Sequence, residues 1–200
     1  MKQTKIKIEL EDRIIELFDE QQYKPNSADN AFTYDQIYLS EEIEVEGYQP
    51  TSMIGIIARD KANHDIVLSS AIVGEVGGAT RLSEESFLTE GNQLIFCICN
   101  QVYALDLLSL ELQWKLEADM ATCFSLYRFG KGIVVYGELQ ISLLGFDGGL
   151  LWQFGASDIF VTPDNQEAFR IEGDLIVVKD WSGDEHWLNE KGEVVKRSRY

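Results

Sequence analysis

A repeat of about 40 residues is the feature that most constrains what this chain can fold into. Its strongly apolar stretches begin near Leu94, Ile133 and Leu175, which are 39 and 42 residues apart, and Trp114 and Trp152 are separated by 38 residues. The three repeated segments span 92–116, 131–154 and 173–196. Such regular spacing predicts a stack of similar units.

Each unit is expected to contain four antiparallel strands. The stretches "ESFLTEG", "CFSLYRFG" and "EAFRIEG" supply one strand before each repeated segment, and glycines in "EGN", "FGKG" and "DGG" suit tight hairpins. The middle strands "LIFCIC", "GIVVY" and "DLIVV" are continuously apolar, which indicates that both faces of each sheet are covered. We therefore predict an all-β, β-propeller-like fold of four-stranded antiparallel units, with three clear blades in 81–200 and a separate β region in 1–80.

The stretches "VYALDLLSLELQWKL" and "LLGFDGGLLWQF" resemble the repeat of quinoprotein-like (PQQ-type) β-propellers over 86–200. The resemblance implies that Trp114 and Trp152 dock each blade on its neighbour, with Val194 or Val195 in that place in the third unit. Three units are fewer than the roughly 4–8 blades of a closed propeller. The quinone and calcium sites of enzymes in that family have no counterpart in this sequence, so no cofactor is carried over.

The region 1–80 is expected to form a diverged blade or a capping sheet. "KIKIEL", "QIYLSEEIEVEGY", "SMIGIIARD" and "DIVLSSAIVGE" are typical of strands, and "KPNSADN" is a polar loop. "EDRIIELFDE" fits a strand or one helical face, and we favour the strand. The glycines of "GEVGGAT" suggest a hairpin turn. If the ring does not close, a second copy of the chain is expected to cover the exposed blade.

Charge narrows the range of partners. The chain has 34 acidic and 17 basic residues, which gives a net charge of −17. Nucleic acid and anionic membranes would be repelled, so we expect neither as a partner. The acidic surface either keeps a β-rich protein soluble or attracts a basic protein partner. Neither a secretory apolar run nor a membrane-spanning stretch is apparent, so we expect a cytoplasmic location.

Few residues suggest chemistry. Cys97, Cys99 and Cys123 have apolar neighbours and are expected to be buried, reduced thiols that hold no metal. His64 stands in a polar turn. The densest polar and aromatic cluster surrounds the second histidine, and its members are Asp180, Trp181, Asp184, Glu185, His186 and Trp187.

Two functions compete for this 180–187 cluster. Aromatic rings beside carboxylates can bind sugars or cations, although blade-closing aromatics with a polar turn are the favoured interpretation. We predict a non-catalytic binding or scaffolding protein. The alternative is a carbohydrate-active hydrolase or lyase, which would need two carboxylates about 5–9.5 Å apart in one concave pocket.

Overall fold

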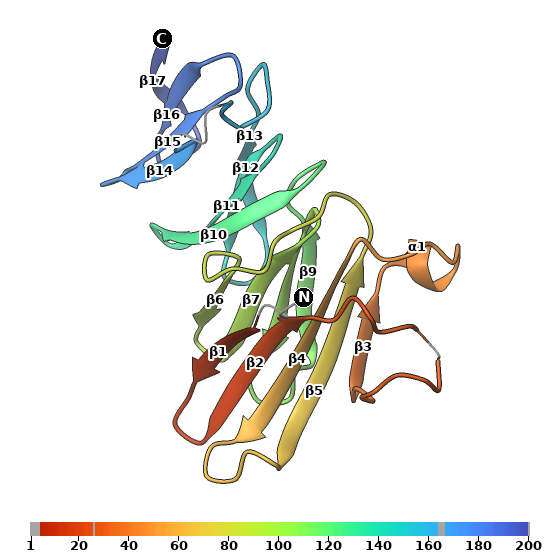
Figure 1. The fold of residues 1–200 in the computed structure, drawn as a ribbon. Coiled ribbons are helices and arrows are strands. Elements are labelled where there is room, and N and C mark those ends of the chain that lie inside the picture. The colour runs from red at the N-terminus through yellow and green to blue at the C-terminus, as the bar shows by residue number, and fades with distance from the viewer. Residues whose placement is uncertain (1–4, 26, 164–166, 200) are drawn as a thin grey trace.

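The computed structural model describes residues 5–25, 27–163 and 167–199. These residues form four sheets and one short helix (Figure 1). The N-terminal sheet has the order β1-β2-β4-β5-β3. Its strands are β1 (Lys5–Glu9), β2 (Arg13–Asp19), β3 (Gln36–Leu39), β4 (Ser52–Asp60) and β5 (Val67–Glu75), and helix α1 (Glu41–Glu44) follows β3.

Three four-stranded antiparallel sheets follow, and we call them the first, second and third blades. Each has its strands in chain order, as the repeat predicts. The first blade contains β6 (Phe87–Glu90), β7 (Gln93–Ile98), β8 (Gln101–Asp106) and β9 (Leu112–Glu117). The second contains β10 (Cys123–Phe129), β11 (Gly132–Gly137), β12 (Ile141–Gly145) and β13 (Leu150–Phe154). The third contains β14 (Phe169–Glu172), β15 (Leu175–Lys179), β16 (Asp184–Leu188) and β17 (Val194–Arg199). The predicted all-β, propeller-like class is confirmed.

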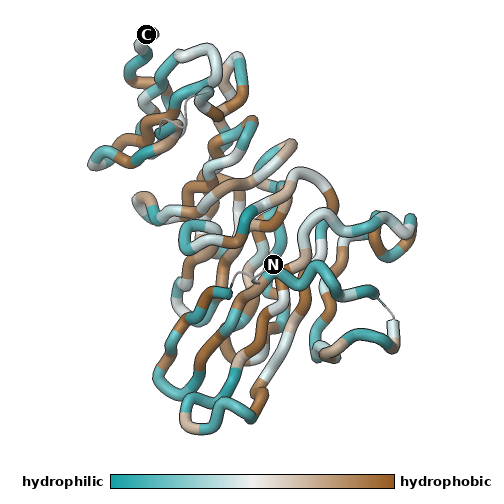
Figure 2. The backbone as a smooth tube through the Cα atoms, viewed as in Figure 1, coloured by the Kyte–Doolittle hydropathy of each residue, from teal (hydrophilic) through white to brown (hydrophobic). Residues whose placement is uncertain are grey.

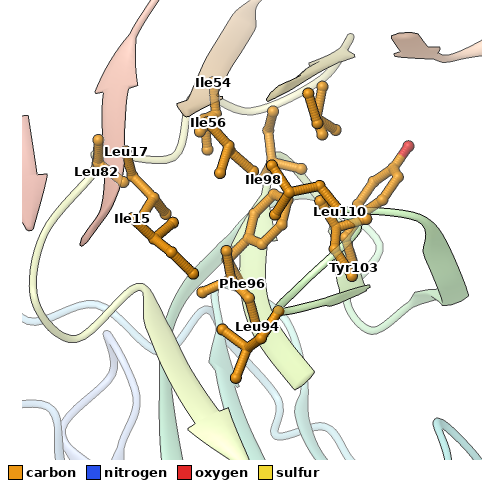
Figure 3. Close-up of a cluster of buried hydrophobic side chains, with 14 of the residues drawn as sticks. Ile15, Leu17, Ile54, Ile56, Leu82, Leu94, Phe96, Ile98, Tyr103 and Leu110 are labelled. Atoms are coloured by element: carbon orange, nitrogen blue, oxygen red, sulfur yellow. The ribbon is translucent and has the colours of Figure 1, made fainter. Parts of the chain in front are cut away.

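The sheets are held together by hydrophobic cores between neighbours, so both faces of the first and second blades are covered as predicted, whereas the third blade shares a core on one face alone within the described residues. The N-terminal sheet and the first blade share a core to which Ile15, Ile56, Phe96 and Tyr103 belong (Figure 3). Two further cores join the first blade to the second and the second to the third. Brown, apolar segments follow the paired strands, and teal segments mark the turns at the lower end of the N-terminal sheet (Figure 2).

The N-terminal sheet differs from a blade because β3 runs parallel to β5 and all its other pairings are antiparallel. The segment "EDRIIELFDE" contains strand β2, as favoured. The expected single strand over "QIYLSEEIEVEGY" is wrong, since it ends at Leu39 and helix α1 begins at Glu41. Helix α1 is a single turn that carries three glutamates, and Ile43 is the residue that it buries.

The hairpin expected at "GEVGGAT" is also wrong. Gly74 and Glu75 end β5, and the chain then crosses to the first blade. Gly77 and Gly78 lie on this crossing, where any side chain on Gly78 would collide with Thr122 before the second blade. These glycines therefore permit close packing between sheets.

Each blade carries one cross-strand row that faces away from the N-terminal sheet, and we call it the outward row. In the first blade the row is Leu88, Ile95, Ala104 and Trp114. In the second blade it is Tyr127, Val134, Leu143 and Trp152. In the third blade it is Arg170, Val177, Trp187 and Lys196. The counterpart of the two tryptophans in the third blade is therefore Lys196, and the expectation of Val194 or Val195 is wrong because apolar character, rather than register, suggested it.

Both tryptophans lie on a turn of the following blade. A methyl group on Gly148 would be 2.5 Å from the ring of Trp114, and one on Gly192 would be 2.6 Å from the ring of Trp152. Both glycines have positive φ angles, of 82° and 75°. The indole Nε1 of Trp152 also donates a hydrogen bond to the backbone oxygen of Glu190 at 2.9 Å. Each ring thus occupies space that only a glycine turn leaves open.

Candidate functional site

The structure divides the 180–187 cluster between two faces of the third blade. Asp180 lies in the β15–β16 turn and is fully buried. Its carboxylate accepts hydrogen bonds from Ser182 Oγ at 2.8 Å and from the backbone N–H of Asp184 at 3.0 Å, and it lies 3.3 Å from His186 Nε2. Burial opposes ionisation of Asp180, but these hydrogen bonds outweigh it and hold its pKa below the usual value.

The other two acids of the cluster are each paired with an arginine. Asp184 Oδ2 lies 2.6 Å from Arg197 Nη2, and Glu185 Oε1 lies 2.6 Å from Arg170 Nη1. Adjacent strand residues project to opposite faces of a sheet, so these two carboxylates do not converge. The paired carboxylates that a glycoside hydrolase needs are therefore not formed by these two residues.

The aromatic residues of the cluster separate in the same way. His186 faces the second blade, where its ring centroid is 5.4 Å from that of Phe154. Trp187 lies on the outward row, with Lys196 Nζ 4.1 Å from its ring centroid, and Trp181 is 48% exposed. The cluster is thus an arrangement of internal pairs within the third blade and at its contact with the second.

The three cysteines are buried and free of disulfides, as the sequence predicts. Burial raises the pKa of Cys97 to about 12, so this thiol stays protonated. Within the described residues, no group of three or more histidine, cysteine, aspartate or glutamate side chains could hold a metal ion. In the same part of the chain, no helix has the length and apolar character needed to cross a bilayer.

A different surface is hollowed on the side of the N-terminal sheet that faces away from the first blade, and we call it the outer face. The loop residues 20–25 and 27–35 lie over it, and Tyr34 of this loop packs in a small core with Met53, Ile57 and Ile72 of the sheet. Asn30 holds the loop closed, since its side chain bonds both backbone groups of Lys24 at 2.8 Å. Ser70 Oγ anchors the other end by donating to Asp35 Oδ2 at 2.7 Å. Hydrogen bonds within the chain therefore hold this loop in place on the outer face.

Two hollows adjoin on the outer face and share Tyr23. The first, the aromatic pocket, has a volume of about 130 Å³ and is lined by Glu20, Gln22, Tyr23, Asp29, Asn30, Ala31, Phe32 and Tyr34. The second, the apolar groove, has a volume of about 300 Å³ and is lined by Tyr23, Pro25, Ile37, Leu39, Ile43 and Glu44. One hollow thus presents rings with two carboxylates, and the other presents aliphatic side chains with one.

The rings of the aromatic pocket are fixed by edge-to-face contacts. The Tyr34 centroid lies 5.6 Å from that of Tyr23 and 4.9 Å from that of Phe32. Its hydroxyl lies 3.2 Å from Glu20 Oε2 and donates to it. Burial, followed by the charge of Glu20, raises the pKa of Tyr34, which keeps the hydroxyl a donor. The hydrogen bond from the uncharged Tyr34 hydroxyl therefore holds Glu20 at the pocket.

The segment that forms the two hollows is strongly acidic. Residues 20–50 contain seven acidic side chains and a single basic one, Lys24. None of the seven belongs to an ion pair within the described residues, and three of them, Glu20, Asp29 and Glu44, line the two hollows. Sequence reasoning noted the glutamates of 41–46 as part of the overall charge but missed this site. The local charge imbalance beside "FTY" and "QIYL" was the signal that could have found it.

The known proteins that resemble this chain are found among solved structures. No protein-family model and no curated protein matches the sequence. The WD40 domain of Neurospora crassa Pan2 is 13% identical, with a TM-score of 0.46, over 62% of this chain and 38% of that one. BamB from Moraxella catarrhalis is 11% identical, with a TM-score of 0.46, over 74% of this chain and 61% of that one. The computationally designed Ika8 protein is 11% identical, with a TM-score of 0.47, over 72% and 46% of the two chains. This chain thus spans less than two thirds of each.

Proposed function

We propose that this chain is a non-catalytic binding module that recognises a basic protein partner through the outer face of its N-terminal sheet. The observation that carries the proposal is that the carboxylates of Glu20, Asp29 and Glu44 line the two hollows and belong to no ion pair within the described chain. Like charges held close together repel one another, and a cationic partner removes that repulsion on binding.

The sheet stack supports a scaffolding role. The N-terminal sheet shares one core with the first blade, and that core is built from fully buried side chains such as Leu17, Ile56 and Leu94. A rigid support reduces the entropy that binding would otherwise cost, because the recognition loop is already held in place. The outer face is thus a preformed surface on a stack of sheets.

The hydrolase alternative receives no support from the 180–187 cluster, since each of its acids is bonded within the third blade. We also propose that the repeats are of the quinoprotein-like kind. The support is the pair of tryptophans, each seated on a glycine turn of the next blade. The free, buried cysteines support placing the protein in a reducing compartment such as the cytoplasm.

An affinity capture at low and high salt tests the proposal. Tagged wild-type protein is compared with Glu41→Lys/Glu44→Lys/Glu46→Lys, which reverses charge in and just after helix α1, next to the apolar groove. Its matched control is Glu84→Lys/Glu117→Lys/Asp174→Lys, which makes the same change in net charge at exposed positions on the blades or just before them. We expect wild type and control to retain a stoichiometric basic protein that high salt releases, and the first variant to lose it. Equal capture by both variants would contradict the proposal.

A further inference from the structure

The free edge of β3 lies beside the apolar groove, which Ile37 and Leu39 of that strand line. β3 is the last strand of its sheet and pairs on one side only, with β5. Within the described residues, no backbone hydrogen bond outside that ladder involves 36–39. Figure 1 shows β3 at the margin of the N-terminal sheet, with α1 at one end and the preceding loop at the other. Unpaired backbone groups on such an edge can accept another strand.

The two edges of this sheet are protected differently. The opposite edge, β1, carries exposed Lys5 and Lys7, and charged lysines discourage the addition of another strand. β3 has the sequence "QIYL" and carries no charge. Its Ile37 is 47% exposed although the side chain is large and apolar. The sheet therefore leaves β3 as its receptive edge.

Side-chain alternation places an added strand beside the apolar groove. The Tyr38 side chain points toward the first blade, where its hydroxyl donates to the backbone oxygen of Leu110 at 3.1 Å. Ile37 and Leu39 point the other way and line the apolar groove. Every second side chain of a strand paired with β3 would project to that same outer face. An apolar side chain there would enter the groove.

The aromatic pocket fits a cation. Rings of Tyr23, Phe32 and Tyr34 lie together with the carboxylates of Glu20 and Asp29. A lysine or arginine head within about 6 Å of an aromatic ring is attracted by the ring face, and a nearby carboxylate adds a charged hydrogen bond. An acidic segment would be repelled by the same carboxylates and by the glutamates of α1.

From these contacts we infer that the bound part of the partner is an extended, basic protein segment that pairs with β3, inserts a lysine or arginine into the aromatic pocket and seats an apolar side chain in the groove. The inference rests on the proposed function and specifies how its site recognises a partner. Backbone hydrogen bonds to β3 provide the affinity for the segment, and the two hollows select its side chains.

The test uses a short, labelled peptide in which lysine and valine alternate, with binding measured by fluorescence anisotropy. One matched peptide has glutamate in place of lysine, and another carries N-methyl groups on alternate amides, which blocks strand pairing. We expect only the unmodified basic peptide to bind wild-type protein, more weakly as salt rises. Wild-type protein that does not bind it, or that binds the N-methylated peptide equally well, would overturn strand addition to β3.

Protein variants locate the binding. Ile37→Asp should weaken binding at least about tenfold, and Glu20→Gln should weaken it several-fold. Ile66→Asp is the matched control, because Ile66 is 48% exposed and lies in the β4–β5 turn. Equal binding by wild type and Ile37→Asp would overturn the inference.

The captured protein separates this inference from the proposed function. If Ile37→Asp retains the captured partner and the charge-reversed variant loses it, the proposed function stands and strand addition fails. If wild type captures no basic partner and binds no peptide, both fail. If wild type self-associates in sedimentation velocity and Ile37→Asp does not, the occupant is a second copy of this chain, and the inference of a separate partner is overturned.

Discussion

The 180–187 cluster and the outer face contain similar side chains but use their charges differently. In the cluster, Asp180, Asp184 and Glu185 are each bonded to a group of the same blade at 2.6–3.3 Å. On the outer face, the carboxylates of Glu20 and Asp29 line a pocket with no cation partner in the described chain. Two of the three carboxylates of the cluster thus have a cationic partner within the chain, whereas Glu20 has a neutral one, the Tyr34 hydroxyl, and its charge stays available to a cation.

The outward row of the third blade also differs from those of the first two blades, which pack on a neighbouring blade. In the first two blades the row ends in a tryptophan that packs on the next blade, and in the third it ends in Lys196, with Arg170 at its other end. The outward row of the third blade is thus charged at both ends, with Val177 and Trp187 between them.

The largest expected difference in stability is between alanine variants of two tryptophans, one packed between blades and one exposed. Trp114→Ala should lower the free energy of unfolding by about 3 kcal/mol, because the ring fills the space over Gly148 between two blades. Trp181→Ala should change it by less than about 0.5 kcal/mol, because that ring is 48% exposed. Urea unfolding measures both. A small loss for Trp114→Ala would mean that the tryptophans do not dock the blades.

The next largest difference in stability is expected between alanine variants of Asp180 and Asp29. Asp180→Ala should cost about 2 kcal/mol, because it leaves the buried N–H of Asp184 and the buried ring of His186 without their acceptor. Asp29→Ala should leave stability nearly unchanged, since that carboxylate is exposed. Thermal unfolding of the two variants compares them. Equal losses would remove the distinction between internal and surface charge.

The pH dependence of Asp180 is a smaller effect with a definite sign. Its pKa is lower in the folded protein than the model-compound value of 3.8, so ionisation of the carboxylate favours folding. That contribution is fully present above the unfolded pKa and is lost as pH falls through the folded pKa. The stability difference between wild type and Asp180→Asn should therefore be constant from about pH 8 to 5 and shrink below about pH 4. A difference that grows on acidification would contradict the assignment.

The acidic outer face should give the smallest change in stability, with the opposite sign. Glu41→Gln/Glu44→Gln/Glu46→Gln removes repulsion among neighbouring glutamates and breaks no ion pair within the described residues. Stability should rise by up to about 0.5 kcal/mol or stay unchanged. A clear loss in chemical denaturation would show that these charges serve the fold.

Much of the fold follows from the sequence because its signals are local. Hairpin glycines and apolar runs repeat in register, so the four strands of each blade could be predicted. The parallel pairing of β3 with β5 could not, because it depends on a contact between Ile37 and Ile72 that no local pattern encodes. Likewise, the aromatic pocket forms only when the loop 20–35 folds over the sheet. The 180–187 cluster drew attention because its residues are adjacent in sequence, but strand alternation separates them.

Hydrogen exchange of the protein with and without the captured basic partner tests the central claim most directly. The account predicts that the partner slows exchange of the amides in β3 and in residues 20–35, and that it leaves those of 180–187 unchanged. Slower exchange at 180–187, with none on the outer face, would contradict it and would return the binding site to the third blade.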